Sequence, residues 1–322
     1  MKMQRIAILG GTGFIGGHLV PKLAAAGHRV TVLSRNREKH RALLVLPSVR
    51  IVSTNVYERA ALVREFAGHD AVLNLVGILN ETGRARFAHA HVDLTASVIA
   101  ACREAGIARL LQMSSINAGN DASKYLKTRG EAETLVKNSG LDWTIFRPTI
   151  VYGAGDGLVS RFHKLLKISP VLPLARPEAK IAPVYVGDVC AAIMRSLARR
   201  DSFGHIHELY GPDTYTLLQI VRRIRDAARL RRVVLPLPDA LGWLQACAAE
   251  LIPGKPFSRD NFKSLKLDAV GTRDGLAELE ITPRRFDTLL PQLLSPDPRE
   301  RRMNEARAGQ RDFAPHAYEG AD

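Results

Sequence analysis

Short apolar runs alternate with longer segments of helical spacing through the first 150 residues. Apolar runs of strand length lie at 5–9, 29–33, 50–53, 70–75, 108–113 and 141–146. Between them, apolar residues recur at intervals of three and four over 14–26, 58–66, 89–105 and 123–139. Strands that alternate with helices predict a parallel sheet with right-handed crossovers. Because the strand runs are apolar at successive positions, we expect helices to cover both faces of the sheet.

The first apolar run leads into a glycine-rich motif. Gly10, Gly13 and Gly16 stand in G-x-x-G-x-x-G spacing, directly after a predicted strand and at the start of a predicted helix. Gly10 permits a tight turn, Gly13 leaves room for a pyrophosphate, and Gly16 allows the helix to pack closely on the strand. The free N–H groups at the helix N-terminus favour phosphate. The motif therefore predicts a dinucleotide site whose contacts include Gly10, Thr12, Gly13, Phe14, Ile15 and Gly16.

This motif and the strand–helix alternation predict an α/β fold, a doubly wound Rossmann sheet with a smaller C-terminal α/β region for a substrate or a partner. We expect the Rossmann domain over 1–153, with a strand at 181–186 and a helix at 187–197 returning to it within 181–200. Residues 154–180, rich in Pro and Gly, predict a loop with one short helix, and together with 201–295 they form the C-terminal region. The polar segment 296–322 predicts a flexible tail.

The end of the second predicted strand bears on the choice of cofactor. An NAD site usually has Asp or Glu there, to accept hydrogen bonds from the ribose hydroxyls. Here the strand ends in Ser34, Arg35, Asn36 and Arg37, with no carboxylate before Glu38. A guanidinium group suits a 2′-phosphate. We therefore expect NADP(H), bound in part by Ser34, Arg35 and Arg37, although solvated surface arginines would show the same pattern.

The chain has a net charge of +14, which favours an anionic partner. No basic stretch is interleaved with stacking aromatics, so we expect no nucleic acid. A predicted helix with Leu217, Ile220, Val221 and Ile224 on one side carries Arg222, Arg225 and Arg229 in a stripe, suited to solvent, an anionic membrane surface or an acidic protein. The segment 296–322 does not contribute to the positive net charge, since it contains five arginines and six acidic residues.

Cysteine content and hydropathy bear on location. Cys102, Cys190 and Cys247 are far apart and odd in number, which favours reduced thiols over a disulfide framework or a metal cluster. No apolar run is long enough to span a bilayer, and the first residues lead directly into a strand without a signal-peptide pattern. We expect a cytoplasmic protein, with a peripheral position at the inner face of the membrane as an option.

Further motifs carry a family resemblance over about the first 200 residues. They are Asn74-Leu75-Val76-Gly77, Met113-Ser114-Ser115, Tyr125-Leu126-Lys127-Thr128-Arg129-Gly130-Glu131, Phe146-Arg147-Pro148-Thr149, Val151-Tyr152-Gly153 and Val184-Tyr185-Val186-Gly187-Asp188-Val189. With the glycine spacing, they resemble the extended or atypical branch of the short-chain dehydrogenase/reductase superfamily, which is NAD-dependent epimerase/dehydratase-like. The stretches 74–77 and 125–129 are most similar to the nucleotide-binding accessory subunit of respiratory complex I, alpha subcomplex subunit 9, and its bacterial relatives.

The resemblance implies roles for individual residues. Tyr125 corresponds to the general acid/base, and Ser114 or Ser115 to the substrate-orienting hydroxyl. The family Lys, four residues after the Tyr, is replaced by Arg129 on the same helix face. A guanidinium still favours a phenolate but is a bulkier, planar group, so we expect weakened catalysis, or a Tyr125 that packs on the nicotinamide and does no chemistry. Further cofactor contacts are expected from Asn55, Leu75, Val76, Gly77, Met113, Tyr125, Arg129, Pro148 and Ile150.

Three functions remain open from the sequence. The first is a weakly catalytic or non-catalytic NADPH-binding protein that supports respiratory complex I or quinone-synthesis proteins. The second is an active NADP-dependent reductase, epimerase or dehydratase on a small or lipid-like substrate. The third is an NADPH-dependent redox sensor. No metal site is expected, because the alternating pair His205 and His207 lacks a third ligand nearby.

Overall fold

The fold is described from a computed structural model, which defines residues 3–35, 43, 45–83, 85–252 and 257–294. Arg37 and the segment 296–322, for which the sequence predicts a phosphate contact and a flexible tail, lie outside the described residues.

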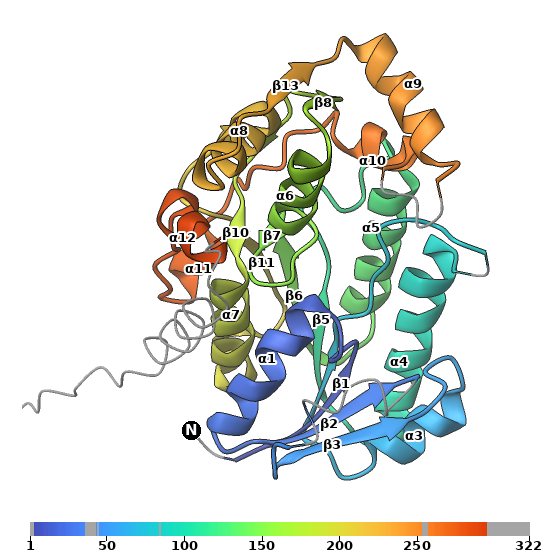
Figure 1. The fold of residues 1–322 in the computed structure, drawn as a ribbon. Coiled ribbons are helices and arrows are strands. Elements are labelled where there is room, and N and C mark those ends of the chain that lie inside the picture. Colours follow the sequence, from blue (N-terminus) through green and yellow to red (C-terminus); the bar gives the residue numbers. More distant parts are fainter. Residues whose placement is uncertain (1–2, 36–42, 44, 84, 253–256, 295–322) are drawn as a thin grey trace, which may run out of the picture.

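A seven-stranded parallel sheet forms the centre of the molecule, in the order β11-β6-β5-β4-β1-β2-β3 (Figure 1). The strands are β1 (Arg5–Leu9), β2 (Arg29–Ser34), β3 (Val49–Ser53), β4 (Ala71–Asn74), β5 (Arg109–Met113), β6 (Asp142–Pro148) and β11 (His205–Leu209). The first six form the doubly wound Rossmann sheet that the sequence predicts. Their carboxyl ends share one edge, and β1 delivers the glycine loop to it.

Both faces of the sheet are apolar, as the strand runs predict. In β1, Ile6 and Ile8 face one helical layer, whereas Ala7 and Leu9 face the other, and all four side chains are fully buried. The layer on the Ile6 side contains α1 (Phe14–Ala25) and α7 (Val186–Ala198). The opposite layer contains α3 (Arg59–Phe66), the π-helical turn η2 (Ala88–Asp93), α4 (Leu94–Glu104) and α5 (Lys124–Lys137).

A second apolar core lies beyond the carboxyl edge of the sheet. It is built from α6 (Val159–Ile168), β8 (Val171–Leu174), β9 (Lys180–Ile181), β12 (Tyr215–Thr216), α8 (Leu217–Ala227), β13 (Val233–Pro236) and α12 (Phe286–Leu293). The helices α9 (Asp239–Ala249) and α10 (Arg259–Ser264) complete this region, whereas α11 (Gly275–Glu278) packs beside β11 of the main sheet, with Leu276 in the core on the Ile6 side. None of the helices in the described ranges is long and apolar enough to cross a bilayer.

Two elements differ from the sequence prediction. The strand expected at 181–186 is two short strands, β9 and β10 (Val184–Tyr185), separated by Ala182 and Pro183, and β10 pairs with β7 (Val151–Tyr152). Proline lacks the N–H group that a continuous ladder needs, which explains the break. The arginine-rich helix ends at Ala227, and Arg229 lies beyond it with φ of 53°, so Arg222, Arg225 and Arg229 do not form one helical stripe.

Candidate functional site

The glycine loop has the backbone geometry of a phosphate-binding turn. Gly10 has φ of 76°, and a β-carbon there would lie 3.0 Å from the Leu75 carbonyl carbon and the Val76 nitrogen. A β-carbon at Gly16 would lie 2.5 Å from the backbone of Gly11, so this glycine allows α1 to approach the loop. Gly13 is the exposed N-cap of α1. The first turn of this helix contains no acidic residue, so its N–H groups suit a pyrophosphate.

Arg35 and an aromatic pair lie at the carboxyl ends of β2 and β3. Arg35 is exposed directly after β2, where buried Ser34 accepts a backbone hydrogen bond from Thr54 N at 2.9 Å. Asn55 caps the next turn, since its Oδ1 accepts from Tyr57 N at 3.2 Å. Tyr57 stacks on His89 of η2 with ring centroids 4.0 Å apart. Burial raises the pKa of Tyr57, and the positive charge of Arg35 opposes this rise.

The Tyr57–His89 pair was not predicted from the sequence. Tyr57 follows β3 and His89 follows β4, so the two rings come into contact only when both strands are in place in the sheet. A stacked, partly exposed aromatic pair beside an arginine suits a flat, negatively charged group.

Arg129 bridges the ends of the next two strands. Its side chain is 94% buried, and its Nη1 donates to Met113 O at 3.0 Å and to Val76 O at 3.4 Å. The guanidinium rests against Gly77, because a β-carbon at Gly77 would lie 2.0 Å from Arg129 Nη2. Four of the predicted cofactor contacts, Val76, Gly77, Met113 and Arg129, therefore gather at one point between β4 and β5.

Tyr125 lies one turn before Arg129, and the guanidinium carbon of Arg129 is 5.5 Å from its ring centroid. The half-buried Tyr125 ring also packs edge-on against Phe87 at 5.8 Å and His91 at 5.5 Å. The Asp260 carboxylate of α10 accepts from Lys124 N at 2.8 Å and Tyr125 N at 3.2 Å. A residue 135 positions away in the chain thus caps the helix that carries Tyr125, and no local sequence pattern indicates this contact.

His91 is a buried neutral imidazole between these elements. Burial, together with the positive charge of Arg129, lowers its pKa to about 2. The Thr128 hydroxyl donates to the carbonyls of Lys124 and Tyr125, so it accepts from His91 Nδ1 at 2.9 Å. His91 Nε2 then accepts from Ile78 N at 3.4 Å. This imidazole therefore joins α5 to the loop after β4 and forms part of the surface on which the Tyr125 ring packs.

The two candidate serines differ in their partners. Ser114 Oγ donates to Glu133 Oε1 at 2.6 Å, and Glu133 also forms a buried ion pair with Arg147, with Nη2 2.5 Å from Oε2. Ser114 is therefore held by the helix α5. Ser115 is also buried, but its Oγ has no hydrogen-bond partner among the described residues. Of the two hydroxyls, Ser115 is the one whose hydrogen-bonding capacity is unused.

The remaining predicted contacts lie around the same edge. Leu75 continues β4, with its N donating to Leu9 O at 2.9 Å, and Phe14 opens α1 with its ring edge-on to His18 at 5.5 Å. Pro148 O accepts from Ile116 N at 2.9 Å, and Ile150 O accepts from Val184 N at 3.0 Å. Thr12 and Ile15 are half-buried in the loop and in the first turn of α1.

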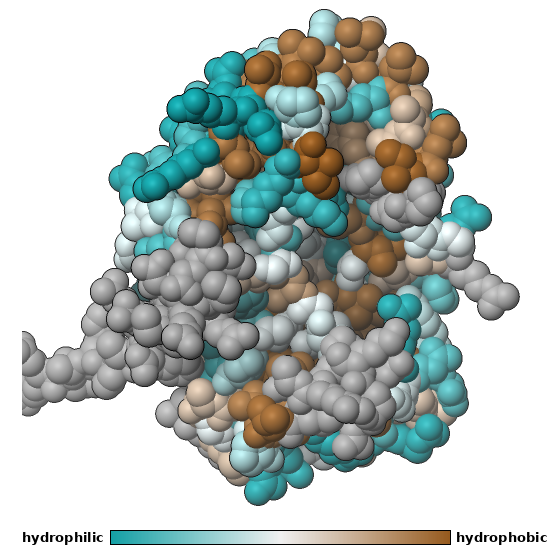
Figure 2. All heavy atoms as spheres, in the orientation of Figure 1, coloured by the Kyte–Doolittle hydropathy of each residue, from teal (hydrophilic) through white to brown (hydrophobic). Residues whose placement is uncertain are grey.

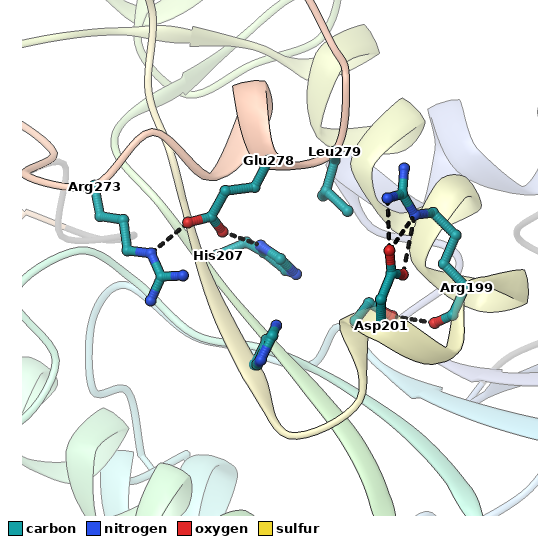
Figure 3. A pocket seen from close by; sticks show the side chains of 8 residues that line it. Arg199, Asp201, His207, Arg273, Glu278 and Leu279 are labelled. Atoms are coloured by element: carbon teal, nitrogen blue, oxygen red, sulfur yellow. Dashed lines mark hydrogen bonds and ion pairs between the residues drawn. The ribbon is translucent and has the colours of Figure 1, made fainter.

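The pair His205 and His207 lies elsewhere, in the edge strand β11. A cavity of about 280 Å³ is lined by Arg199, Asp201, Ser202, His205, His207, Arg273, Glu278 and Leu279 (Figure 3). His207 Nδ1 lies 2.9 Å from Glu278 Oε2, and burial lowers the pKa of His207. No group of three or more metal-ligating side chains occurs among the described residues. The cavity begins at the amino end of β11, away from the edge that holds the glycine loop.

Residues 10–166 match the NAD(P)H-binding family model. The chain is 32% identical over 243 residues to the complex I alpha subcomplex subunit 9 of Arabidopsis thaliana mitochondria, covering 72% of this chain and 60% of the relative. It is also 30% identical over 237 residues to the ceramide reductase of Caulobacter vibrioides, covering 73% of this chain and 74% of the relative.

The fold is also found in solved structures. The NADPH-dependent quinone oxidoreductase of Escherichia coli, solved with NADPH, superposes with a TM-score of 0.73 at 18% identity, covering 90% of this chain and 100% of the other. The glycine loop, the parallel sheet and these relatives agree. The chain belongs to the NAD(P)H-binding family that includes the ceramide reductase of Caulobacter vibrioides and the complex I alpha subcomplex subunit 9 proteins, and it has the fold of the solved epimerases and dehydratases.

Proposed function

We propose that the chain binds NADPH along the carboxyl edge of its sheet and serves as a weakly catalytic or non-catalytic nucleotide-binding protein. The pyrophosphate would lie on the N-terminus of α1, where the N-cap Gly13 has no side chain to occupy the space and Gly10 forms the turn against Leu75 and Val76. Arg35 would pair with the 2′-phosphate, and Tyr57 with His89 would flank the adenosine end. The nicotinamide end would lie beside Arg129 and Tyr125. The bound cofactor would supply a hydride.

The single observation that carries the weakly catalytic assignment is the position of Arg129. Its Nη1 donates to two carbonyls and its Nη2 lies against Gly77, so the cation joins the ends of β4 and β5. A lysine at this position would present a mobile point charge to the ribose and to Tyr125 instead. Ser114, in turn, donates to Glu133 and is held away from a substrate.

The identity of the relatives and the net charge of the chain support a proposal about its partners. Because relatives with this fold include complex I accessory subunits, we propose that the chain supports a respiratory complex or quinone metabolism on the cytoplasmic side of the membrane. The net charge of +14 supports a peripheral contact with anionic lipid.

Calorimetric titration of NADPH and NADH into the protein tests the cofactor assignment. NADPH should bind at least about tenfold more tightly, because a charged hydrogen bond to phosphate contributes about 1.5–3 kcal/mol. Arg35→Asp should remove this preference. Arg29→Asp, which changes the same charge at the opposite end of β2, is the matched control and should keep it. Equal affinities of the two nucleotides for the wild type would refute the proposal.

An active reductase on a lipid-like substrate is the second candidate. The observations that favour it are the Ser115 hydroxyl without a hydrogen-bond partner among the described residues, the half-buried Tyr125 next to Arg129, and the 74% coverage of a ceramide reductase. NADPH oxidation with long-chain carbonyl and quinone substrates distinguishes the two. A wild-type turnover that Tyr125→Phe abolishes would establish the enzyme, whereas a rate that appears only in Arg129→Lys would support the accessory protein.

A further inference from the structure

Exposed apolar side chains are concentrated at one end of the molecule. The described residues expose fourteen large hydrophobic side chains, and ten of them lie between 165 and 252. Figure 2 shows hydrophobic surface gathered at the upper end of the molecule, in the region of α9 and β13, beside the hydrophilic surface of α8. Scattered apolar residues are normal on a protein surface, but a contiguous group marks an interaction site.

The ribbon of β8 and β13 presents one apolar side to solvent. In β8, Val171 and Pro173 are exposed while Leu172 and Leu174 are buried. The parallel partner β13 places Val233 opposite Val171 and Leu235 opposite Pro173, and both residues are exposed, by 57% and 48%. Strand alternation therefore puts all four on the same outward side. The inward side is filled by the second apolar core, so the outward side has no partner within the described residues.

Helix α9 extends this apolar side. Gly242 and Ala246 are buried against the rest of the molecule, so the helix turns Leu241 and Leu244, exposed by 52% and 63%, toward solvent. Gln245 Nε2 donates to Pro173 O at 2.8 Å and fixes the helix beside β8. Leu251 and Ile252, immediately after the helix, are exposed by 86% and 53%.

Positive charge borders this surface. Residues 159–176 contain four basic and no acidic residues, and residues 217–238 contain six arginines and one Asp. Some of these cations are neutralised, as Arg223 is by Asp287 and Arg225 by Asp226. Lys164, Lys167 and Arg231 are exposed, and none has an ion-pair partner within the described residues. An apolar surface with cations at its border matches the boundary between lipid headgroups and acyl chains.

We propose that an apolar face formed by Ile168, Val171, Val233, Leu235, Leu241, Leu244, Leu251 and Ile252 inserts into the headgroup region of an anionic bilayer. The inference rests on the peripheral membrane contact in the proposed function and assigns it to side chains. A second copy of the chain would bring two cationic borders together, which disfavours it as the occupant. Binding of the chain to the bilayer would therefore have an apolar as well as an electrostatic contribution. The apolar contribution would remain when added salt screens the charges.

The apolar face is linked to the nucleotide site through α10. Trp243 of α9 packs edge-on against Phe262 of α10 at 5.5 Å, and Asp260 of the same helix caps the N-terminus of α5 at Tyr125. Docking through α9 would therefore bring the Tyr125 end of the nucleotide site close to lipid. There it could bind a membrane-dissolved substrate or contact a membrane complex.

Vesicle sedimentation with the full chain tests the proposal. The vesicles contain phosphatidylcholine alone or with about 30% phosphatidylglycerol, an anionic content that attracts basic residues. The wild type should bind the anionic vesicles and remain bound at high salt, when electrostatic attraction is screened. Leu244→Glu with Leu251→Glu should weaken binding by at least about 30-fold, because each leucine loses its apolar burial. Val45→Glu, at a residue 77% exposed outside the apolar face, is the matched control and should bind within about threefold of the wild type.

Three results would overturn the inference. They are no binding to anionic vesicles at low salt, equal binding by wild type and the double variant, and a wild-type dimer in solution that the double variant converts to a monomer. The last result would assign the apolar face to a second copy. NADPH titration of the same samples separates the two proposals, since the double variant should bind NADPH as the wild type does if only the membrane contact is lost.

Discussion

Gly77 and Arg129 should depend on each other energetically. Gly77→Ala places a methyl group 2.0 Å from the present position of Arg129 Nη2, so the guanidinium must move. Gly77 has no positive φ, so the alanine itself causes no backbone strain. The cost comes from the bond between Arg129 Nη1 and Met113 O, 3.0 Å long and buried, and from the carbonyl that it leaves without a partner. Hydrogen bonds to charged groups contribute about 1.5–3 kcal/mol, so we expect Gly77→Ala to lower the free energy of unfolding by about 2 kcal/mol.

A double-mutant cycle separates this coupling from a general effect of the alanine. Arg129→Met keeps an unbranched apolar stem and removes the guanidinium. In that background Gly77→Ala should be neutral or stabilise the protein by about 0.5 kcal/mol, since an unstrained Gly→Ala change restricts the unfolded chain. The coupling energy between the two positions should therefore be about 2 kcal/mol or slightly more.

Urea unfolding measured by tryptophan fluorescence gives the four free energies, by linear extrapolation to zero denaturant. Additive effects, within about 0.5 kcal/mol, would refute the assignment of Arg129 as the bridge between β4 and β5. NADPH titrations of the same four proteins report whether the bridge also shapes the nucleotide site.

Further predictions concern the glycine loop, His91 and Asp260. Gly16→Ala should destabilise the protein by more than about 2 kcal/mol, because its β-carbon meets the Gly11 backbone at 2.5 Å, whereas Gly17→Ala, with nothing within 4 Å, should be neutral or stabilising; similar melting temperatures for both would contradict the packing argument. The pKa of His91 is about 2 when folded and 6.5 when unfolded, so stability should fall as pH drops below 6.5, by up to about 1.4 kcal/mol per pH unit from this group. His91→Asn should flatten the dependence of the melting temperature on pH, and an unchanged slope would exclude His91 as its source. Asp260→Ala should cost about 1 kcal/mol and weaken any Tyr125-dependent turnover, while Asp260→Asn, which keeps an acceptor, should retain more of both; equal effects of the two would argue against the capping role.

Local sequence patterns were enough to predict the doubly wound sheet and the nucleotide loop. The reason is that the strands and the glycine loop depend on residues that are close together in the sequence. The strand runs are apolar at every position because both faces are covered, and Gly10 and Gly16 are needed by the turn and by the contact with Gly11. The same holds for α1 and α5, whose helical spacing and terminal residues lie within a few turns of chain.

Contacts between distant segments were decided by packing. Asp260 reaches Tyr125 across 135 positions, Tyr57 meets His89 across β4, and Glu133 takes the hydroxyl of Ser114 from the end of β5. The role of Arg129 also follows from its surroundings, since its bridge between Val76 and Met113 exists only once β4 and β5 are paired. Likewise, β8, β13 and α9 contain short apolar runs, and the folded chain leaves Val171, Val233, Leu235, Leu241 and Leu244 of these runs exposed. Hydrophobic periodicity reveals which residues share a side of an element, but whether that side is covered depends on what the rest of the chain brings to it.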